Sequence, residues 1–285
     1  MTSPVSAADN HSTPVPASKK TIAAWTLWDV GNASFNAIMT TFVFAVYLTS
    51  SSFGEEGHPA AVLSVGLTIA GVLIALLAPI SGQRADASGK RGLWLGVNSV
   101  LLAVIMAFCF FVAPSPDYLI LGVVLLSLGN LVTEFAVVNY NALLPAISTQ
   151  QTIGKVSGTG WAAGYFGGIL ALAIVLVGFV SPGILGIPED GAYNLRAVAV
   201  FSAIWAIAFS LPLMLAVHKI SPAPRSVEPQ KSILDSYRDL FATIRRLYRE
   251  APTTRYFLLS SAVFRDGLNG IFTFGGILAA NSFGF

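Results

Sequence analysis

Residues 82–92 read GQRADASGKRG, a short polar segment between two long apolar segments, 60–81 and 93–112. Its glycines permit a tight turn between two helices. Each apolar neighbour has the length of about 20 residues that a helix needs to cross a bilayer. The three segments together therefore predict a hairpin of two membrane-spanning helices.

The composition of the whole chain indicates a membrane protein with several spans. Of the 285 residues, 54% are hydrophobic and 11% are charged, whereas soluble domains have about 25% charged residues. Because lipid offers no partner to backbone polar groups, spanning segments are helices or strands of a closed barrel, and segments this continuously apolar do not fit barrel strands. Besides the hairpin, five apolar segments have sufficient length: 22–49, 118–143, 158–180, 195–217 and 254–283. We therefore predict an all-α polytopic membrane protein.

Lysine and arginine are concentrated in alternate connections between these predicted spans. They precede the first span and occur in the connections after the second, fourth and sixth spans. The other connections contain SSFGEEGHP, APSPD and SPGILGIPEDGAYN, in which neither residue occurs. Since basic residues are retained on the cytoplasmic side of a membrane, we expect a cytoplasmic N-terminus.

Several function classes lack the residues that they require. The net charge of +2 is too small to indicate a nucleic-acid partner. The single cysteine, Cys109, lies in an apolar segment, and His11, His58 and His218 fall in the tail or in connections. They form no cluster for a metal or for a catalytic nucleophile, and no phosphate-binding motif for ATP is present. We expect neither an enzyme nor a cofactor.

The distribution of apolar segments divides the chain into four regions. Residues 1–20, rich in Ser, Thr, Pro and Ala, are expected to form a disordered cytoplasmic tail. Residues 21–218 form a six-helix bundle, residues 219–253 a cytoplasmic linker, and residues 254–285 one more span. A seventh span without a bundle of its own suggests that this chain is the first part of a longer protein.

The linker contains the sequence SILDSYRDLFATIRRLYRE, residues 232–250, with apolar residues at helical spacing and charges on the other face. This pattern is typical of an amphipathic helix on the cytoplasmic membrane surface. A helix that binds a partner protein is the alternative.

Three predicted spans carry acidic and amide side chains on one face. These side chains, with one adjacent arginine, are Asp29, Asn32 and Asn36 in the first span, Asn130, Glu134 and Asn141 in the fourth, and Arg265, Asp266 and Asn269 in the seventh. An aspartate in the middle of a membrane helix costs about 2.5–3.5 kcal/mol, and the cost is tolerated when the side chain faces a wet cavity or a partner. We expect the three faces to meet in one aqueous cavity that binds a small polar substrate or a proton. One alternative is that the polar residues of the first and seventh spans resemble each other by chance. The other is that Glu134 takes part in an ion pair that only stabilises the structure.

The fifth predicted span has Gly160, Gly164 and Gly168 at four-residue spacing. Glycines so spaced lie on one helix face and let another helix approach closely. Tight packing alone and a surface that slides or rocks are both compatible with this row.

The polar segment after the second span fits the spacing G-x-x-x-D-x-x-G-[KR]-[KR] at Gly82, Asp86, Gly89, Lys90 and Arg91. With this spacing and position it resembles the signature loop of the major facilitator superfamily. An aspartate there can pair with a basic residue or with the N-terminus of a helix in another bundle, and so latch one conformation. An ordinary basic cytoplasmic turn is the alternative.

Four other segments resemble the vacuole-effluxer branch of that superfamily, which includes autophagy-related amino-acid exporters. They are WDVGNASF (28–35), VNYNALLP (138–145), VSGTGWAAGYFGG (156–168) and FRDGLNGIFTFGG (264–276). The resemblance implies a major-facilitator-type six-helix bundle followed by the first helix of a second bundle.

The resemblance also implies a function. It is secondary transport by alternating access, with efflux of amino acids or similar polar metabolites and protons as a candidate coupling ion. The full-length protein would be a monomer in contact with lipid, in the cell membrane of a bacterium or the vacuolar membrane of a fungus. The alternative is a scaffold or receptor that does not transport and signals through the 232–250 helix.

Overall fold

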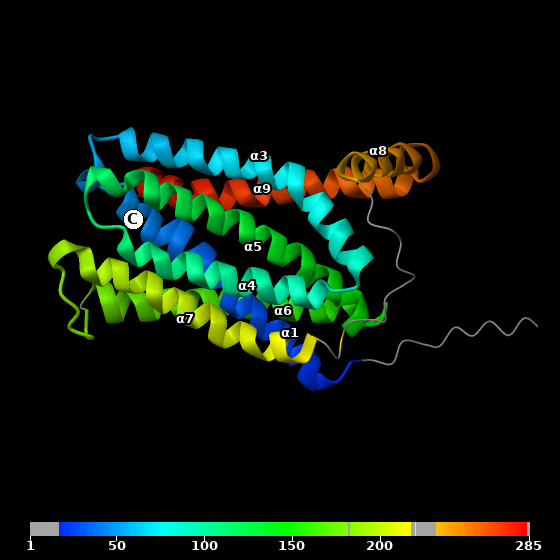
Figure 1. The fold of residues 1–285 in the computed structure, drawn as a ribbon, viewed down its shortest axis with the longest axis horizontal. Helices are drawn as coiled ribbons and strands as arrows, with labels where there is room; N and C mark the ends of the chain where they lie inside the picture. Colours follow the sequence, from blue (N-terminus) through cyan, green and yellow to red (C-terminus); the bar gives the residue numbers. More distant parts are fainter. Residues whose placement is uncertain (1–16, 182, 218–219, 221–231, 284–285) are drawn as a thin grey trace, which may run out of the picture. The chain divides into compact units, whose positions relative to one another are not determined.

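The computed structural model describes residues 17–181, 183–217, 220 and 232–283, which form two units, Met1–Pro229 and Gln230–Phe285. The described residues are helices and their connections, with no strand among them (Figure 1). This confirms the predicted all-α fold class. The predicted tail lies outside the described residues as far as residue 16.

The first unit is a bundle of long helices. Its main elements are α1 (Lys19–Ser34), the π-helix η1 (Phe35–Phe42), α2 (Phe44–Leu48), α3 (His58–Ser88), α4 (Arg91–Phe108), α5 (Leu119–Ile147), α6 (Ile153–Val175) with the π-helix η5 (Leu176–Val180), and α7 (Tyr193–Ala216). In the described part of the chain, six helical segments are long and apolar enough to cross a membrane. They correspond to the six spans predicted for the bundle.

Helix α1 lies at the centre of the packing scheme. It packs against α6 on one side and α7 on the other, while α4 joins α7 to α5, and α3 packs on α5 (Figure 1). The Ser18 side chain caps α1 by accepting a hydrogen bond from the backbone N–H of Thr21 at 3.2 Å, which satisfies one of the donors that a helix start leaves without a partner. The Trp205 indole N–H donates to the carbonyl of Val30 at 3.1 Å and ties α7 to the middle of α1.

The outer surface of the bundle is apolar. Along α3, Val65, Ile69, Val72 and Leu76 expose between 50% and 58% of their surface. Exposed apolar surface of this extent marks an interaction surface in soluble proteins, and in a polytopic protein it is the surface that faces lipid.

The first span changes helix type in its middle. From Phe35 to Phe42 the backbone is π-helical, and the Thr40 and Thr41 hydroxyls donate to the carbonyl of Asn36 at 2.9 and 2.8 Å. A π-helix turns through a smaller angle per residue than an α-helix. Asn32 lies before this change and is buried, whereas Asn36, the second residue of the π-helix, is exposed. That Asp29, Asn32 and Asn36 line one site stays a prediction. Single π-helical turns are rare in proteins, but those that occur are often found at functional sites.

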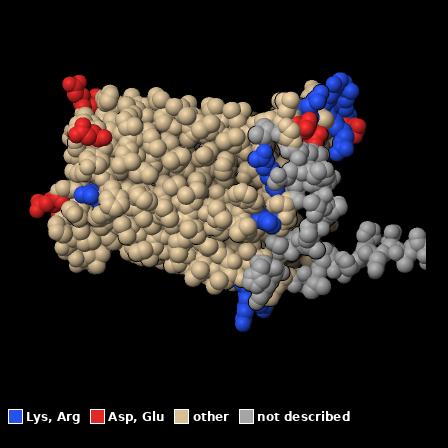
Figure 2. Space-filling view, viewed as in Figure 1, with Lys and Arg blue, Asp and Glu red and all other residues tan. Residues whose placement is uncertain are grey.

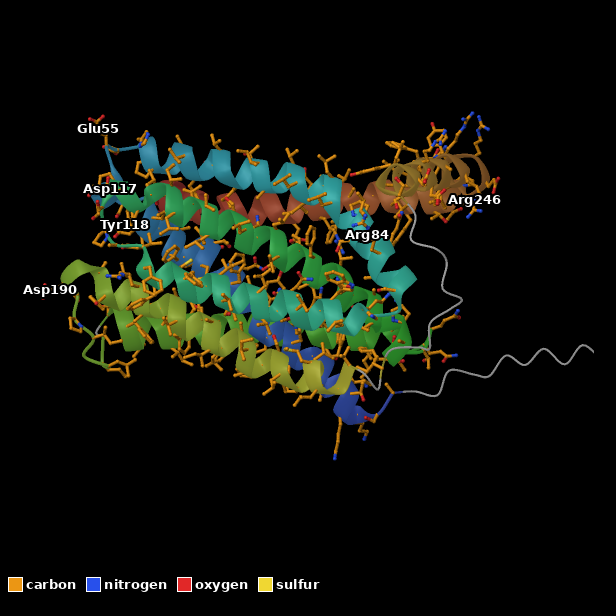
Figure 3. All side chains as sticks on the ribbon, in the orientation of Figure 1. Glu55, Arg84, Asp117, Tyr118, Asp190 and Arg246 are labelled. Atoms are coloured by element: carbon orange, nitrogen blue, oxygen red, sulfur yellow. The ribbon has the colours of Figure 1, made fainter. Side chains whose placement is uncertain are left out.

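Charged side chains of the bundle gather at its two ends (Figure 2). Figure 3 places Glu55, Asp117 and Asp190 at one end and Arg84 at the other. On the face that Figure 2 shows, the surface between the two ends is formed by uncharged residues, as a surface that faces lipid requires.

The second unit consists of α8 (Ile233–Glu250) and α9 (Pro252–Phe283). Arg255 joins the two helices: its guanidinium lies 4.4 Å from the ring centroid of Tyr248 and 4.7 Å from that of Tyr256. Helix α8 covers most of the segment predicted to be amphipathic, and α9 covers the predicted seventh span. Their places on and across a membrane stay predictions.

Candidate functional site

The glycine row of α6 lies directly on α1. A Cβ atom added to Gly160 would stand 2.6 Å from the Trp25 ring, and one added to Gly164 would stand 2.8 Å from Oδ2 of Asp29. A Cβ on Gly168 would meet Ala33 at 3.4 Å. Real Cβ atoms essentially never approach another atom within 3.0 Å. Glycine at 160 and 164 therefore leaves the space that the Trp25 ring and the Asp29 carboxylate occupy.

Asp29 is partly buried on α1, and its carboxylate rests against Gly164. Within the described part of the chain, no side chain forms an ion pair with it and no group donates a hydrogen bond to it. Burial of a carboxylate is costly unless it is paired or hydrogen-bonded. The free carboxylate can therefore accept a proton, a water molecule or a cationic group of a ligand.

An aromatic clamp, formed by Trp25, Trp28 and Tyr140, fixes α1 to α5 beside Asp29. The Tyr140 ring lies between the two indoles, with centroid distances of 4.2 and 4.3 Å. The Trp25 indole N–H donates to the carbonyl of Tyr140 at 3.2 Å, and the Trp28 indole N–H donates to Oγ of Ser99 on α4 at 2.9 Å. The clamp thereby holds three helices together next to the carboxylate.

Several buried side-chain oxygens of α1 and α5 have no hydrogen-bond partner among the described residues. They are Oγ1 of Thr26, Oδ1 of Asn32, Oγ of Ser127, Oγ1 of Thr133 and the hydroxyl of Tyr140. An unsatisfied buried polar atom costs about 1–3 kcal/mol, and native proteins usually satisfy such atoms with water or another bound group. Oγ of Ser127 faces Gly66 on α3, so at the α1–α5 contact the other oxygens are the places where polar ligands would be stabilised.

Asn32 and Thr133 lie at matching depths in this contact. Phe35 meets Gly129, and Trp25 meets Tyr140, so the two helices run antiparallel. Asn32 and Thr133 fall between these two pairs, and they are 5% and 1% exposed. The unpartnered oxygens therefore continue from Asp29 along the inside of the bundle.

The other predicted site residues have varied environments. Asn130 and Glu134 are partly buried on α5, Asn141 is exposed near its end, and Arg265 and Asp266 are exposed on α9. The side chain of Asn269 lies outside the described residues. Convergence of the seventh span with the first and fourth stays a prediction.

Sequence reasoning did not single out Thr133 or Tyr140. The two lie seven residues apart on α5, which is close to two helical turns and places them on one face. That spacing was the available signal, but polar residues at such spacing also occur where they only pack.

The signature loop contacts the same region from the end of the bundle. Gly89 has φ +63°, a left-handed conformation that favours glycine, and Nη1 of Arg91 donates to the carbonyl of Ala142 on α5 at 2.9 Å. A Cβ on Gly82 would meet Val138 at 3.2 Å, and Lys90 is exposed. The side chain of Asp86 lies outside the described residues, and the predicted latch stays a prediction.

Two surface grooves lie apart from the predicted site residues. One has a volume of about 560 Å³ and is lined by residues of η1, α2 and η5 that include Phe42, Val46 and Leu176. The smaller, of about 220 Å³, lies between α3 and α5. None of the predicted site residues lines either groove.

Comparisons with known proteins give the family of this sequence. Residues 51–285 match the family described as "Vacuole effluxer Atg22 like". The chain is 26% identical over 261 residues to the uncharacterised MFS-type transporter YxiO of Bacillus subtilis (strain 168). This alignment covers 88% of the chain and 58% of YxiO, so the chain spans little more than half the length of this relative. No solved structure matches the chain.

Proposed function

We propose, since the chain belongs to the Atg22-like vacuole effluxer family, that the full-length protein is a secondary transporter that works by alternating access. The match confirms the family recognised from the signature segments. The family and the relative YxiO are transporters of the major facilitator type rather than enzymes. In this proposal the six-helix bundle is one half of the transporter and rocks against a second half about a central site.

The observation that carries the proposal is the free carboxylate of Asp29 between α1 and α6, next to unpartnered oxygens of α1 and α5. A transporter needs polar groups inside the membrane that lack permanent partners, because these groups have to bind the transported solute and then release it. In a purely structural bundle, such groups would be paired with one another.

The chemistry of these groups favours a small zwitterion such as an amino acid. The carboxylate of Asp29 binds an ammonium group, and the oxygens of Asn32 and Thr133 bind hydrogen-bond donors. Asp29 is also the candidate carrier of a coupling proton, since an acid in a membrane span is a common proton relay. Efflux as the direction of transport is supported by the family description.

The ends of the bundle support a cytoplasmic N-terminus. The end that carries Glu55, Asp117 and Asp190 would face outward, and the opposite end, with Arg84, would face the cytoplasm (Figure 3). This agrees with the tendency of basic residues to stay inside. The membrane would be the cell membrane in a bacterium and the vacuolar membrane in a fungus.

A second candidate function rests on α8. Its side chains Leu234, Phe241, Ile244 and Tyr248 are at least half exposed, and such a face can bind a membrane surface or a partner protein. A scaffold or receptor that signals through this face would need no free carboxylate at Asp29.

Transport in vesicles separates the two functions. The full-length protein is reconstituted, and uptake and efflux of a labelled panel of amino acids and other polar metabolites are measured with and without a pH gradient. We expect Asp29→Asn to lower the flux at least tenfold at a normal level of protein in the membrane. The control is Glu55→Gln, which removes an exposed carboxylate at the end of the bundle. Wild-type flux in Asp29→Asn would refute the proposed site.

A further inference from the structure

The hydroxyl of Tyr140 has no structural task within the described part of the chain. Tyr140 is 4% exposed, its ring is held on both faces by the aromatic clamp, and its hydroxyl has no hydrogen-bond partner. A phenylalanine would stack between Trp25 and Trp28 equally well without burying a polar atom. Buried tyrosine hydroxyls usually have a partner, so a partner of another kind has to be sought.

The hydroxyl faces the same strip of α6 as the carboxylate of Asp29. It lies 3.1 Å from the place of a Cβ on Gly160, and Oδ2 of Asp29 lies 2.8 Å from the place of a Cβ on Gly164. Gly160 and Gly164 are about one helical turn apart, or ~6 Å along the axis. The carboxylate is close enough to act electrostatically on Tyr140. The two oxygen groups are thus neighbours on a surface without side chains.

One bridging group can join two polar groups that lie against adjacent turns of α6. Two hydrogen bonds of ordinary length through one oxygen or nitrogen atom span roughly 5–6 Å, and such bridges are nearly as favourable as a direct hydrogen bond. The Trp25 ring, which lies against Gly160, shields this place from one side. A bridge would satisfy the unpartnered hydroxyl and the free carboxylate together.

We propose that Tyr140 is a positioning residue for Asp29: its hydroxyl donates a hydrogen bond to the carboxylate through one bridging water molecule and holds it against the glycine row. The inference rests on the proposed role of Asp29 as the ligand-binding acid. It adds a residue of α5 to that site and gives the hydroxyl of Tyr140 a task. A ligand ammonium group would displace the water and donate hydrogen bonds to the carboxylate and to the phenolic oxygen of Tyr140.

The test uses dicyclohexylcarbodiimide, an apolar reagent that modifies carboxyl groups within membranes. The full-length protein in vesicles is treated with the reagent, and modification of Asp29 is followed over time by mass spectrometry of its peptide. The protonated carboxyl group gives its proton to a nitrogen of the reagent, and its oxygen then attacks the carbodiimide carbon. A hydrogen bond that holds the carboxylate in place therefore slows the reaction. Hydrogen bonds to charged groups contribute about 1.5–3 kcal/mol, so we expect Tyr140→Phe to speed the modification of Asp29 by about tenfold or more.

The matched control is Tyr47→Phe, which removes another buried tyrosine hydroxyl at a distant place. The Tyr47 hydroxyl donates to the carbonyl of Val112 at 2.8 Å, so its loss should lower thermal stability and leave the modification of Asp29 unchanged. Tyr140→Phe, in contrast, should change the rate of Asp29 modification.

Two outcomes would overturn the inference. One is an equal rate of Asp29 modification in wild type and Tyr140→Phe. The other is an equally faster modification of Asp29 in Tyr47→Phe, which would show that a general loss of stability, and not the loss of the hydroxyl near Asp29, exposes the carboxyl. The proposed function is tested by a different measurement. If it is wrong, Asp29→Asn will transport as well as wild type, and this result does not depend on the rate of Asp29 modification.

Discussion

Alanine substitutions along α6 should separate packing from function, because the glycines of this one helix have different neighbours. The informative set is Gly158→Ala, Gly164→Ala and Gly167→Ala, each of which adds a single methyl group. A Cβ on Gly158 meets nothing within 4 Å. Alanine is favoured over glycine in a helix by about 0.8–1.0 kcal/mol, so Gly158→Ala should stabilise the protein by up to that amount.

Gly167→Ala should destabilise the protein. Its Cβ would stand 2.5 Å from Cγ1 and 3.0 Å from the Cα atom of Val30. The backbone of α1 cannot rotate away as a side chain can, and the Trp205 hydrogen bond to the Val30 carbonyl fixes it further. Overpacking of this kind costs about 1–3 kcal/mol, which exceeds the gain in helix propensity.

Gly164→Ala should affect function more than stability. Its Cβ would stand 2.8 Å from Oδ2 and 3.0 Å from Cγ of Asp29, and these atoms form the end of a side chain that can rotate. The carboxylate therefore moves and the helices stay. We expect a free energy of unfolding within about 1 kcal/mol of wild type, because the gain in helix propensity and the cost of the new contact offset each other. We also expect a loss of transport similar to that of Asp29→Asn.

The assays are thermal unfolding of the full-length protein in detergent and transport in vesicles. The expected order of stability is Gly158→Ala, then Gly164→Ala, then Gly167→Ala, and among the two most stable variants only Gly164→Ala loses flux. If Gly167→Ala were as stable as Gly158→Ala, α6 would not pack on α1 as described. If Gly164→Ala transported normally, the position of the Asp29 carboxylate would not matter.

Two further substitutions test local features of the bundle. Trp28→Phe keeps a ring on Tyr140 but removes the hydrogen bond to Ser99, and it should cost about 1 kcal/mol in the free energy of unfolding; an unchanged unfolding temperature would contradict the bond. Gly89→Ala places a side chain at φ +63° and should cost about 1 kcal/mol, whereas Gly154→Ala, with open space around its Cβ, should cost nothing. Equal stability of these two variants would show that the turn after α3 relaxes without glycine.

The long apolar segments determined most of the fold in advance. To predict each span of the bundle, only the length and the apolar character of a segment are needed, and both are properties of the local sequence. The glycine spacing likewise identified a face that helices can approach, and the structure places that face on α1. Such features depend on neighbours within one helix.

Features that depend on contacts between distant helices were less accessible. The pairing of Tyr140 with Trp25 joins residues 115 positions apart, and no periodicity within α5 reports it. The α-helical repeat likewise gives no sign of the π-helix that begins at Phe35, next to Asn36. Local patterns thus gave the helices and one packing face, while the environment of the carboxylate required the tertiary arrangement.

The π-helix η1 has a practical consequence for any scan of the first span. An accessibility experiment with single cysteines should give a period of 3.6 residues up to Ser34, a longer period through Phe42, and the shorter one again from Phe44 onward. Residues on the two sides of this π-helix therefore need separate helical wheels before a pattern of reactive positions is compared with the candidate site.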